Sequence, residues 1–181
     1  MLPRIPAWQI AMVGCLKAGL VPIPCLTMLT GSDIAYRLEN SGAEAAVTTT
    51  KHTGKISDKT DLRLRLSIGG GLNWMEFHSA IEKQSTIFKA PEIDAEDPAI
   101  LYYTSGSAGK PKGVLHAARA IFTWRVSAWY WLTLMENDVM WCTADTGWAR
   151  RGPPFFLDPG LPGQPYWYMM VPSIHLSVLN S

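Results

Sequence analysis

The sequence predicts an α/β fold with alternating helices and mostly parallel strands. Helix and strand patterns alternate along the chain. Apolar residues recur at helical spacing in some segments, and in others they alternate with polar residues or form short runs, as in strands. The 181 residues are 48% hydrophobic and 17% charged, which is typical of a packed globular protein. This length suits one domain or part of a larger one.

The N-terminal segments alternate between helix and strand signals. Apolar residues at helical spacing predict a helix over Pro6–Lys17, and Gly19 supplies a stop. Ser32 can cap a second helix over residues 33–42, which ends at a glycine. Residues 43–49, AEAAVTT, then predict a strand.

A strand and a helix are expected after a polar connection rich in lysine and threonine. Residues 62–68, LRLRLSI, alternate strictly, which predicts a strand with one exposed face, closed by the glycines at 69–71. Asn73 and Glu76 have the spacing of a capping box, so we expect a helix from there to about residue 84.

The third part of the chain centres on a loop rich in glycine and hydroxyl groups. Residues 99–103, AILYY, predict a strand, and residues 104–113, TSGSAGKPKG, form the loop. A long helix over residues 115–134 and a strand over 138–142 are expected to follow.

This loop has the composition of a phosphate-binding loop. Glycines let backbone N–H groups approach an anion, hydroxyls donate further hydrogen bonds, and the lysines supply positive charge. It is not a Walker A loop, because Pro111 stands where that pattern requires glycine. A plain surface turn of serine and glycine is the alternative interpretation.

The loop closely resembles the phosphate-binding signature of the adenylate-forming enzymes. The flanks YYTSGSAGKPKGVLH and WCTADTGWA are similar to the acetyl- and medium-chain acyl-CoA synthetase branch of that superfamily. The earlier segments PAWQIAMVGCLKAGLVPIPC and SDIAYRLENSGAEAAVT resemble the same branch, so the resemblance covers roughly residues 2–149. Ala108 departs from the signature, which usually has threonine or serine there.

The resemblance implies a partial N-terminal adenylate-forming domain over residues 1–151. Such enzymes use ATP, Mg²⁺ and coenzyme A to convert a carboxylic acid through an acyl-adenylate to acyl-CoA. It further implies that the loop holds the β- and γ-phosphates of ATP. The implied cofactor-binding residues are Thr104, Ser105, Gly106, Ser107, Ala108, Gly109, Lys110, Pro111, Lys112 and Gly113.

Other candidate residues have weaker signals. The resemblance places Asp145, Thr146, Gly147 and Trp148 near an acyl and nucleotide pocket, and a turn with Trp148 in the core is the alternative. We expect His116 to cap or pack at the start of a helix, and the cluster Trp124, Trp129 and Trp131 to pack in the core. The acidic residues Glu92, Asp94, Glu96 and Asp97 are interpreted as a solvated connection, and no metal site is assigned.

Composition narrows the partners and the compartment. A net charge of +1 gives no electrostatic footprint for nucleic acid or an anionic membrane. The family resemblance implies small-molecule partners, namely ATP, a carboxylic acid and coenzyme A. Cys15, Cys25 and Cys142 are scattered, which argues against a disulfide framework or a zinc site. No signal peptide is visible, and residues 120–135 are short for a membrane helix and include Arg125. Cytoplasm or mitochondrial matrix is expected.

The C-terminal residues 152–181 form an atypical tail. The segment is broken by prolines and has no helical or strand period, and a one-nucleotide frame shift after Gly152 permits TSILFGPWSPGAAVLVYDG, a family-like continuation. An alternative C-terminus from splicing is the other explanation. The sequence also lacks the family's Tyr-Gly-x-Thr-Glu element, whose glutamate holds magnesium, and no catalytic residue is assigned.

Three functional hypotheses follow. The first is an acyl-CoA synthetase fragment that carries the ATP-phosphate loop. The second is a non-catalytic product that at most binds nucleotide or a partner. The third is a fragment of another adenylating enzyme, which the CTADTGW flank disfavours. We expect the chain by itself to be marginally stable and catalytically inactive.

Overall fold

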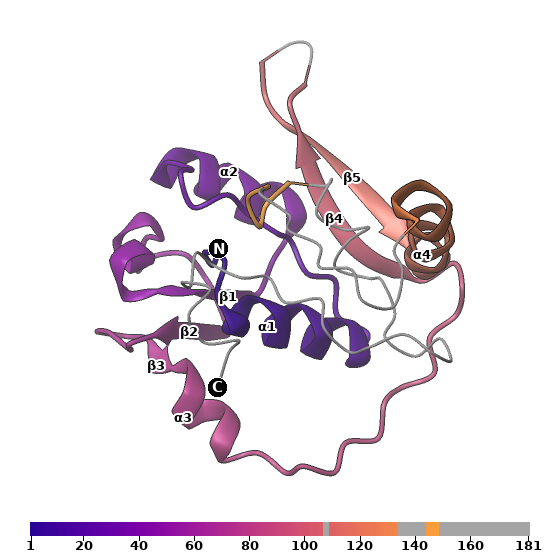
Figure 1. Cartoon of the computed structure of the whole chain (residues 1–181). Coiled ribbons are helices and arrows are strands. Elements are labelled where there is room, and N and C mark those ends of the chain that lie inside the picture. The colour runs from indigo at the N-terminus through magenta and orange to yellow at the C-terminus, as the bar shows by residue number, and fades with distance from the viewer. Residues whose placement is uncertain (107–108, 134–143, 149–181) are drawn as a thin grey trace, which may run out of the picture.

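A computed structural model of the chain describes residues 1–106, 109–133 and 144–148 (Figure 1). Within these ranges the elements follow in the order α1 (Pro6–Lys17), α2 (Gly31–Ser41), β1 (Ala45–Thr49), the 3-10 helix η1 (Thr50–Lys55), β2 (Leu64–Ile68), β3 (Met75–Glu76), α3 (Phe77–Glu82), β4 (Pro98–Thr104), β5 (Lys112–Ala117) and α4 (Ala118–Leu132). The alternation of helices and strands confirms the predicted α/β class.

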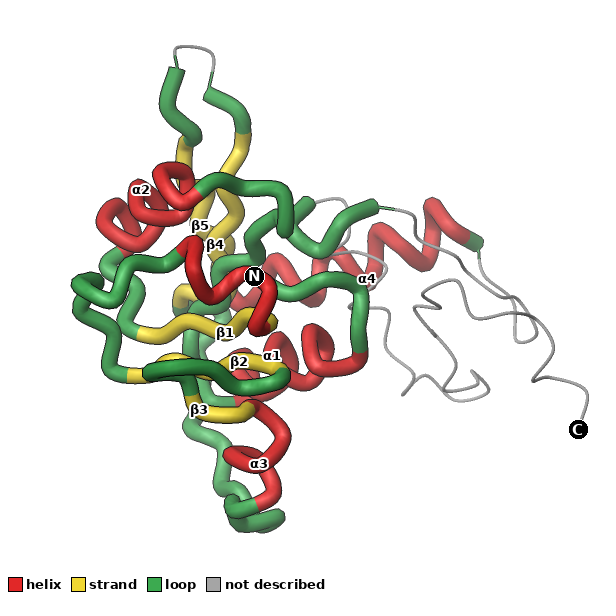
Figure 2. Tube along the Cα trace, turned by 90° about the vertical axis from the view of Figure 1, so that its left-hand side faces the viewer, coloured by secondary structure: helices red, strands yellow, loops and turns green. Residues whose placement is uncertain are grey.

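The described strands form two sheets. In the first, β1, β2 and β3 lie in that order and all pair in parallel, with Ala45 opposite Leu64 and Leu66 opposite Met75. In the second, β4 and β5 pair antiparallel, with Thr104 opposite Lys112. Figure 2 shows the three parallel strands one above another and the β4–β5 hairpin extending beyond α2.

Helix α1 joins the two sheets through the main hydrophobic core. Its buried Trp8 and Met12 cluster with Ile100 and Tyr102 of β4 and with Phe77 of α3, and residues of β1 and β2 pack against the same cluster. Burial of several large apolar side chains is the main stabilising contribution to such an arrangement. The helix thereby fixes the base of the hairpin relative to the parallel sheet.

The bounds of α1 are confirmed, whereas α2 begins two residues earlier than predicted, at Gly31, and has a different cap. α1 has the predicted range Pro6–Lys17, and Gly19 follows with a φ of 68°. α2 ends before Gly42, whose φ of 64° is the left-handed conformation expected of a C-terminal glycine. Its N-cap is Thr30 and not Ser32, because Thr30 forms a reciprocal capping box with Asp33.

Two predictions for the following segments are wrong. The polar face of β2 is not exposed: Ser67 is fully buried, whereas Leu64 is 39% exposed. Asn73 does not cap α3, since its φ of 62° places it in a turn, and the cap is Glu76, whose carboxylate accepts from Ser79 N at 2.7 Å. Met75 and Glu76 instead form β3, because they pair with the neighbouring β2.

The segment after the loop differs most from expectation. Residues 112–117 form β5, and the helix begins only at Ala118. The loop therefore lies at the tip of a β-hairpin, where we expected a strand-to-helix turn. Pairing with β4 decides this, because Val114 and Leu115 face Tyr102 and Leu101 across the ladder and gain backbone hydrogen bonds there.

Several predicted features lie outside the described residues. They are Ser107 and Ala108 of the loop, the strand over 138–142 with Cys142, the tail 152–181, and the side chain of Trp129. In the part of the chain that the structure describes, no helix is both long and apolar enough to span a membrane.

Candidate phosphate-binding site

The glycines of the β4–β5 loop are required by geometry. A Cβ on Gly106 would lie 2.5 Å from the carbonyl oxygen of Lys110, so the two arms of the loop approach too closely for any side chain there. Gly109 has a φ of 104°, a backbone conformation that L-residues rarely adopt. The loop is thus a tight, glycine-dependent structure at the end of a regular ladder.

The lysines of the loop form no ion pair with any residue that the structure describes. Among the described residues, ion pairs join Arg63 to Glu44 and Arg119 to Glu96, and neither Lys110 nor Lys112 belongs to one. Both lysines are exposed. Thr104 and Ser105 are also exposed and place hydroxyls at the start of the loop. Ammonium groups and hydroxyls gathered around a glycine loop are the donors that a polyphosphate requires.

Helix α2 lies against the hairpin and holds it in place. The Tyr36 hydroxyl donates to the carbonyl oxygen of Pro111 at 3.1 Å, and the Tyr103 hydroxyl donates to Asn40 Oδ1 at 2.8 Å. Arg37 is buried, with only 9% of its surface exposed. Its guanidinium lies 5.1 Å from the Tyr103 ring centroid and donates to the Asp33 carbonyl at 2.8 Å. These contacts fix the hairpin against the body of the protein.

A cavity of about 1180 Å³ lies beneath the hairpin. Its wall includes Lys110 to Gly113 from the loop, Tyr36 and Arg37 from α2, and apolar side chains of α1 and of residues 20–24. It is large enough for a small organic molecule, and it places the loop at its rim.

The segment Asp145–Trp148 has a structural role at its centre. Thr146 is 1% exposed and its hydroxyl donates to the Leu2 carbonyl at 2.6 Å. A Cβ on Gly147 would lie 2.3 Å from Leu26 N, so the segment packs directly on that backbone. Trp148 is 54% exposed, which excludes the interpretation that it is a core residue.

We expected His116 at the start of a helix, but it lies in β5. Its ring is half-buried, with its centroid 5.9 Å from that of Tyr102 and 4.9 Å from that of Trp124. Burial lowers the pKa of His116. It is therefore a packing residue, as the preferred interpretation held. Trp124 packs there too, whereas Trp131 is exposed and not in the core.

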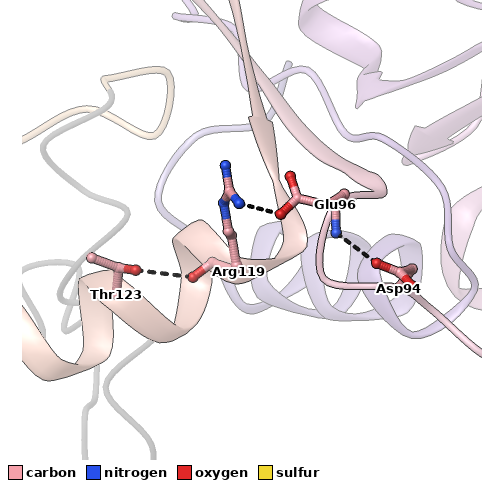
Figure 3. A network of polar contacts seen from close by, with 4 residues as sticks. All are labelled: Asp94, Glu96, Arg119 and Thr123. Atoms are coloured by element: carbon pink, nitrogen blue, oxygen red, sulfur yellow. Dashed lines mark hydrogen bonds and ion pairs between the residues drawn. The ribbon is translucent and has the colours of Figure 1, made fainter.

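The acidic connection before β4 holds the start of α4 (Figure 3). Glu96 pairs with the Arg119 guanidinium, and Asp94 Oδ1 accepts from Glu96 N at 3.0 Å. The carbonyls of Ala95 and Asp97 accept from the first N–H groups of α4. In the described ranges, no three histidine, cysteine or acidic side chains gather as a possible metal site.

The structure places the predicted site residues in two separate groups. Thr104 to Gly106 and Gly109 to Gly113 lie together at the hairpin, and Asp145 to Trp148 pack beside residues 2 and 25–26. Tyr36, Arg37 and Asn40 were missed as neighbours of the loop. No local pattern identifies them, because their contacts with the hairpin join residues 63 to 75 positions apart.

Comparison with known proteins identifies the family. The profile of the AMP-binding enzyme family matches residues 1–151. The human mitochondrial acyl-coenzyme A synthetase ACSM5 is 31% identical over 156 residues, which are 82% of this chain and 27% of that protein.

Solved structures agree with this relationship. The acyl-CoA synthetase of Brucella canis is 27% identical, covers 91% of this chain and superimposes with a TM-score of 0.77, over 31% of its own chain. The o-succinylbenzoate coenzyme A synthetase of Bacillus subtilis, solved with ATP and magnesium ion, has the same fold, with a TM-score of 0.70 and 19% identity. The match covers 87% of this chain and 40% of that protein's chain. The chain thus spans about a third or less of the first relatives it matches. With 151 of its residues covered by the profile, the chain belongs to the AMP-binding enzyme family, and its described residues form part of an adenylate-forming domain.

Proposed function

We propose that this chain carries the ATP-phosphate loop of an acyl-CoA synthetase, an enzyme that activates a carboxylic or fatty acid through acyl-AMP. The observation that supports it most is the hairpin loop, in which a glycine that tolerates no side chain stands beside two lysines that form no ion pair among the described residues. Residues 104–113 would contact the β- and γ-phosphates, and Ser107 and Ala108 are assigned by the family signature alone.

The chemistry explains the need for this loop. A carboxylate is a poor electrophile, and transfer of the adenylyl group gives it a good leaving group. The triphosphate carries dense negative charge, which the loop neutralises and orients while the α-phosphorus is attacked. Lys110 and Lys112 supply charge, and Thr104 and Ser105 supply hydrogen bonds.

Magnesium and coenzyme A belong to the proposal for the whole enzyme. Magnesium would neutralise further phosphate charge, and the residues that would ligate it belong to a sequence element that this chain lacks. The segment Asp145–Trp148 would border the acyl pocket, because Trp148 is exposed while its neighbours are fixed. Small molecules are the proposed partners, and the cytoplasm or the mitochondrial matrix the proposed compartment.

The loop assignment is tested with inorganic tripolyphosphate, ATP and AMP on the 181-residue chain, by calorimetry. Tripolyphosphate and ATP should bind, and AMP, which has no β- or γ-phosphate, more weakly. Lys110→Ala and Lys112→Ala should each weaken tripolyphosphate binding about tenfold, because each removes a charge-assisted contact. Lys59→Ala, an exposed lysine in a distant turn, is the matched control and should change nothing.

Glycine variants test the geometry of the same loop. Gly106→Ala should weaken tripolyphosphate binding, because the new methyl group would lie 2.5 Å from a backbone oxygen. Gly54→Ala, where the methyl group meets nothing within 4 Å, is the control. If the lysine and glycine variants bind tripolyphosphate as the controls do, the loop is not a phosphate site and the proposal is wrong.

The domain division is a further proposal. We propose that residues 1–151 are the family domain and that 152–181 arise from a shifted frame or an alternative splice, which the end of the family match at residue 151 supports. Sequencing the gene and transcript through codons 148–170 tests it. An intact frame that continues into family-like sequence would support the frame shift, whereas a confirmed stop after Ser181 would contradict it.

A further inference from the structure

Tyr36 of α2 contacts both the backbone and a cation of the hairpin loop. Its hydroxyl donates to the Pro111 carbonyl at 3.1 Å, and Lys110 Nζ lies 5.1 Å from the centroid of its ring. These two loop residues are neighbours, and they are 74 and 75 positions away from Tyr36 in the sequence. One side chain therefore reaches the exit of the loop from a separate helix.

We propose that Tyr36 is a positioning residue of the phosphate loop: its ring holds the Lys110 ammonium, and its hydroxyl holds the Pro111 carbonyl, so that both groups are set before a phosphate arrives. This inference deepens the proposed function and rests on it. Tyr36 itself need not touch the phosphate.

An aromatic ring suits this task better than a carboxylate would. A ring attracts an ammonium through its quadrupole and leaves the full positive charge available to a second partner. A carboxylate in the same place would neutralise the charge and compete with phosphate. Lysine has a long, flexible side chain whose freedom must be lost when it binds a ligand, so a ring that already confines it reduces that loss.

The hydroxyl of Tyr36 acts on the backbone. The Pro111 carbonyl belongs to the peptide group that joins Pro111 to Lys112, so the hydrogen bond sets the orientation of the chain as it enters β5. The proline ring already restricts φ at this position. Together they fix the direction in which Lys110 and Lys112 leave the loop.

Tyr36 is itself held firmly enough to act in this way. Its ring meets the Tyr103 ring edge-to-face, with centroids 6.3 Å apart and planes at 72°. The Tyr103 hydroxyl bonds to Asn40 one turn further along α2, so the helix and the hairpin are joined there as well. The hydrogen bond of the Tyr103 hydroxyl involves neither Lys110 nor Pro111, which makes Tyr103→Phe a matched control.

Tripolyphosphate affinity is the first test. Tyr36→Leu removes the ring and the hydroxyl and should weaken binding about fivefold, within the range of a lost cation–π contact and hydrogen bond. Tyr36→Phe keeps the ring and should weaken binding about twofold. Tyr103→Phe, which breaks the bond to Asn40 at the same interface, should leave the affinity unchanged.

A double-mutant cycle separates positioning from a general structural role. If the Tyr36 ring acts through Lys110, Tyr36→Leu and Tyr36→Phe should have the same tripolyphosphate affinity in a Lys110→Ala background. A role that is merely structural would leave the difference in place. Equal affinities of the wild-type chain and Tyr36→Leu would also overturn the inference.

A ligand-free measurement keeps the two proposals distinguishable. Lysines labelled by reductive ¹³C-methylation keep their charge, and the Lys110 resonance, assigned with Lys110→Arg, should be shifted upfield by the Tyr36 ring. The shift should persist in Tyr36→Phe and disappear in Tyr36→Leu. A Lys110 resonance that is the same in all three chains overturns the positioning inference. A shifted resonance in a wild-type chain that binds no tripolyphosphate overturns the proposed function and leaves the ring contact established.

Discussion

At the scale of single residues, close approaches of the backbone decide which positions accept a side chain. Gly147 packs on the peptide between Cys25 and Leu26, and the neighbouring Thr146 is buried with its hydroxyl on the Leu2 carbonyl. Gly106 has the same constraint inside the β4–β5 loop. In both places the glycine is needed for space, and a sequence pattern alone does not distinguish this need from a need for flexibility.

Gly147→Ala should destabilise the protein by about 3 kcal/mol, at the upper end of overpacking costs, because backbone atoms cannot move aside cheaply. Its methyl carbon would lie 2.3 Å from Leu26 N and 2.6 Å from the Cys25 carbonyl carbon. Urea unfolding measures the change. Gly14→Ala is the control, since an added methyl group in α1 meets nothing within 4 Å and should stabilise the helix by about 0.5–1 kcal/mol. Equal midpoints for the two variants would contradict the packing at Gly147.

His116 should make stability depend on pH. Burial lowers its pKa in the folded state, so the unfolded chain, in which histidine titrates near about 6.5, binds the proton more tightly. The stability that the neutral ring contributes is fully present above the unfolded-state pKa. It is lost as the pH falls from the unfolded-state pKa to the lower folded-state pKa. Burial raises the pKa of Tyr102 to about 12, so this neighbour stays uncharged throughout.

Urea unfolding of the wild-type chain and of His116→Phe, compared between about pH 7.5 and pH 5, measures this contribution. The variant keeps a ring against Trp124 and should lose less stability on acidification. His52, whose pKa burial also lowers, is present in both chains and cancels in the comparison. Parallel loss of stability in the two chains would contradict the prediction.

At the scale of elements, α2 links the capping of a helix to the geometry of the loop. Its N-terminus is closed by Thr30, whose hydroxyl accepts from Asp33 N at 3.2 Å, while Thr30 N donates to Asp33 Oδ2 at 2.9 Å. One turn later the same helix presents Tyr36, Arg37 and Asn40 to the hairpin. The end of the helix and its docking face are therefore parts of one rigid support.

Thr30→Ala should cost about 1 kcal/mol of stability, the usual effect of losing an N-cap. Hydrogen bonds from Thr30 hold the pKa of Asp33 below its ordinary value, so part of this stability should be lost in acid as that carboxylate is protonated. Denaturant unfolding of both chains near neutral pH measures the cost. Ser32→Ala, at the position that we first expected to cap, should have a much smaller effect, and a larger effect there would identify Ser32 as the cap.

At the scale of the whole molecule, the described residues of α4 and β5 expose apolar side chains. Phe122, Val126 and Tyr130 recur every four residues on α4 and are exposed, as are Val114 and Leu115 on β5. Exposed apolar surface contributes nothing to stability until it is buried, which favours the predicted marginal stability of the chain.

The 181-residue chain should bind tripolyphosphate but should not form acyl-CoA from ATP, a fatty acid and coenzyme A. In the proposed function, charge neutralisation by the loop would supply one part of the transition-state stabilisation, and the sequence has no Tyr-Gly-x-Thr-Glu element to hold magnesium. Pyrophosphate release and mass spectrometry of acyl-CoA measure the activity. Turnover at a rate typical of the family would show that this prediction is wrong.

The sequence by itself determined the family, the fold class and the position of the loop. The helix Pro6–Lys17, which begins at a proline and has apolar residues at helical spacing, was predicted to the residue. The glycine, hydroxyl and lysine pattern of residues 104–113 predicts a phosphate loop, because that chemistry needs particular residue types close together in the chain.

Tertiary structure decided what depends on distant partners. Residues 112–117 have an apolar run that suits a helix or a strand, and pairing with β4 made them a strand. The burial of Ser67 depends on what covers the sheet, and the contact of Tyr36 with Lys110 depends on how α2 docks on the hairpin. Local sequence patterns do not predict such contacts, because the contacts form between residues that only folding brings together.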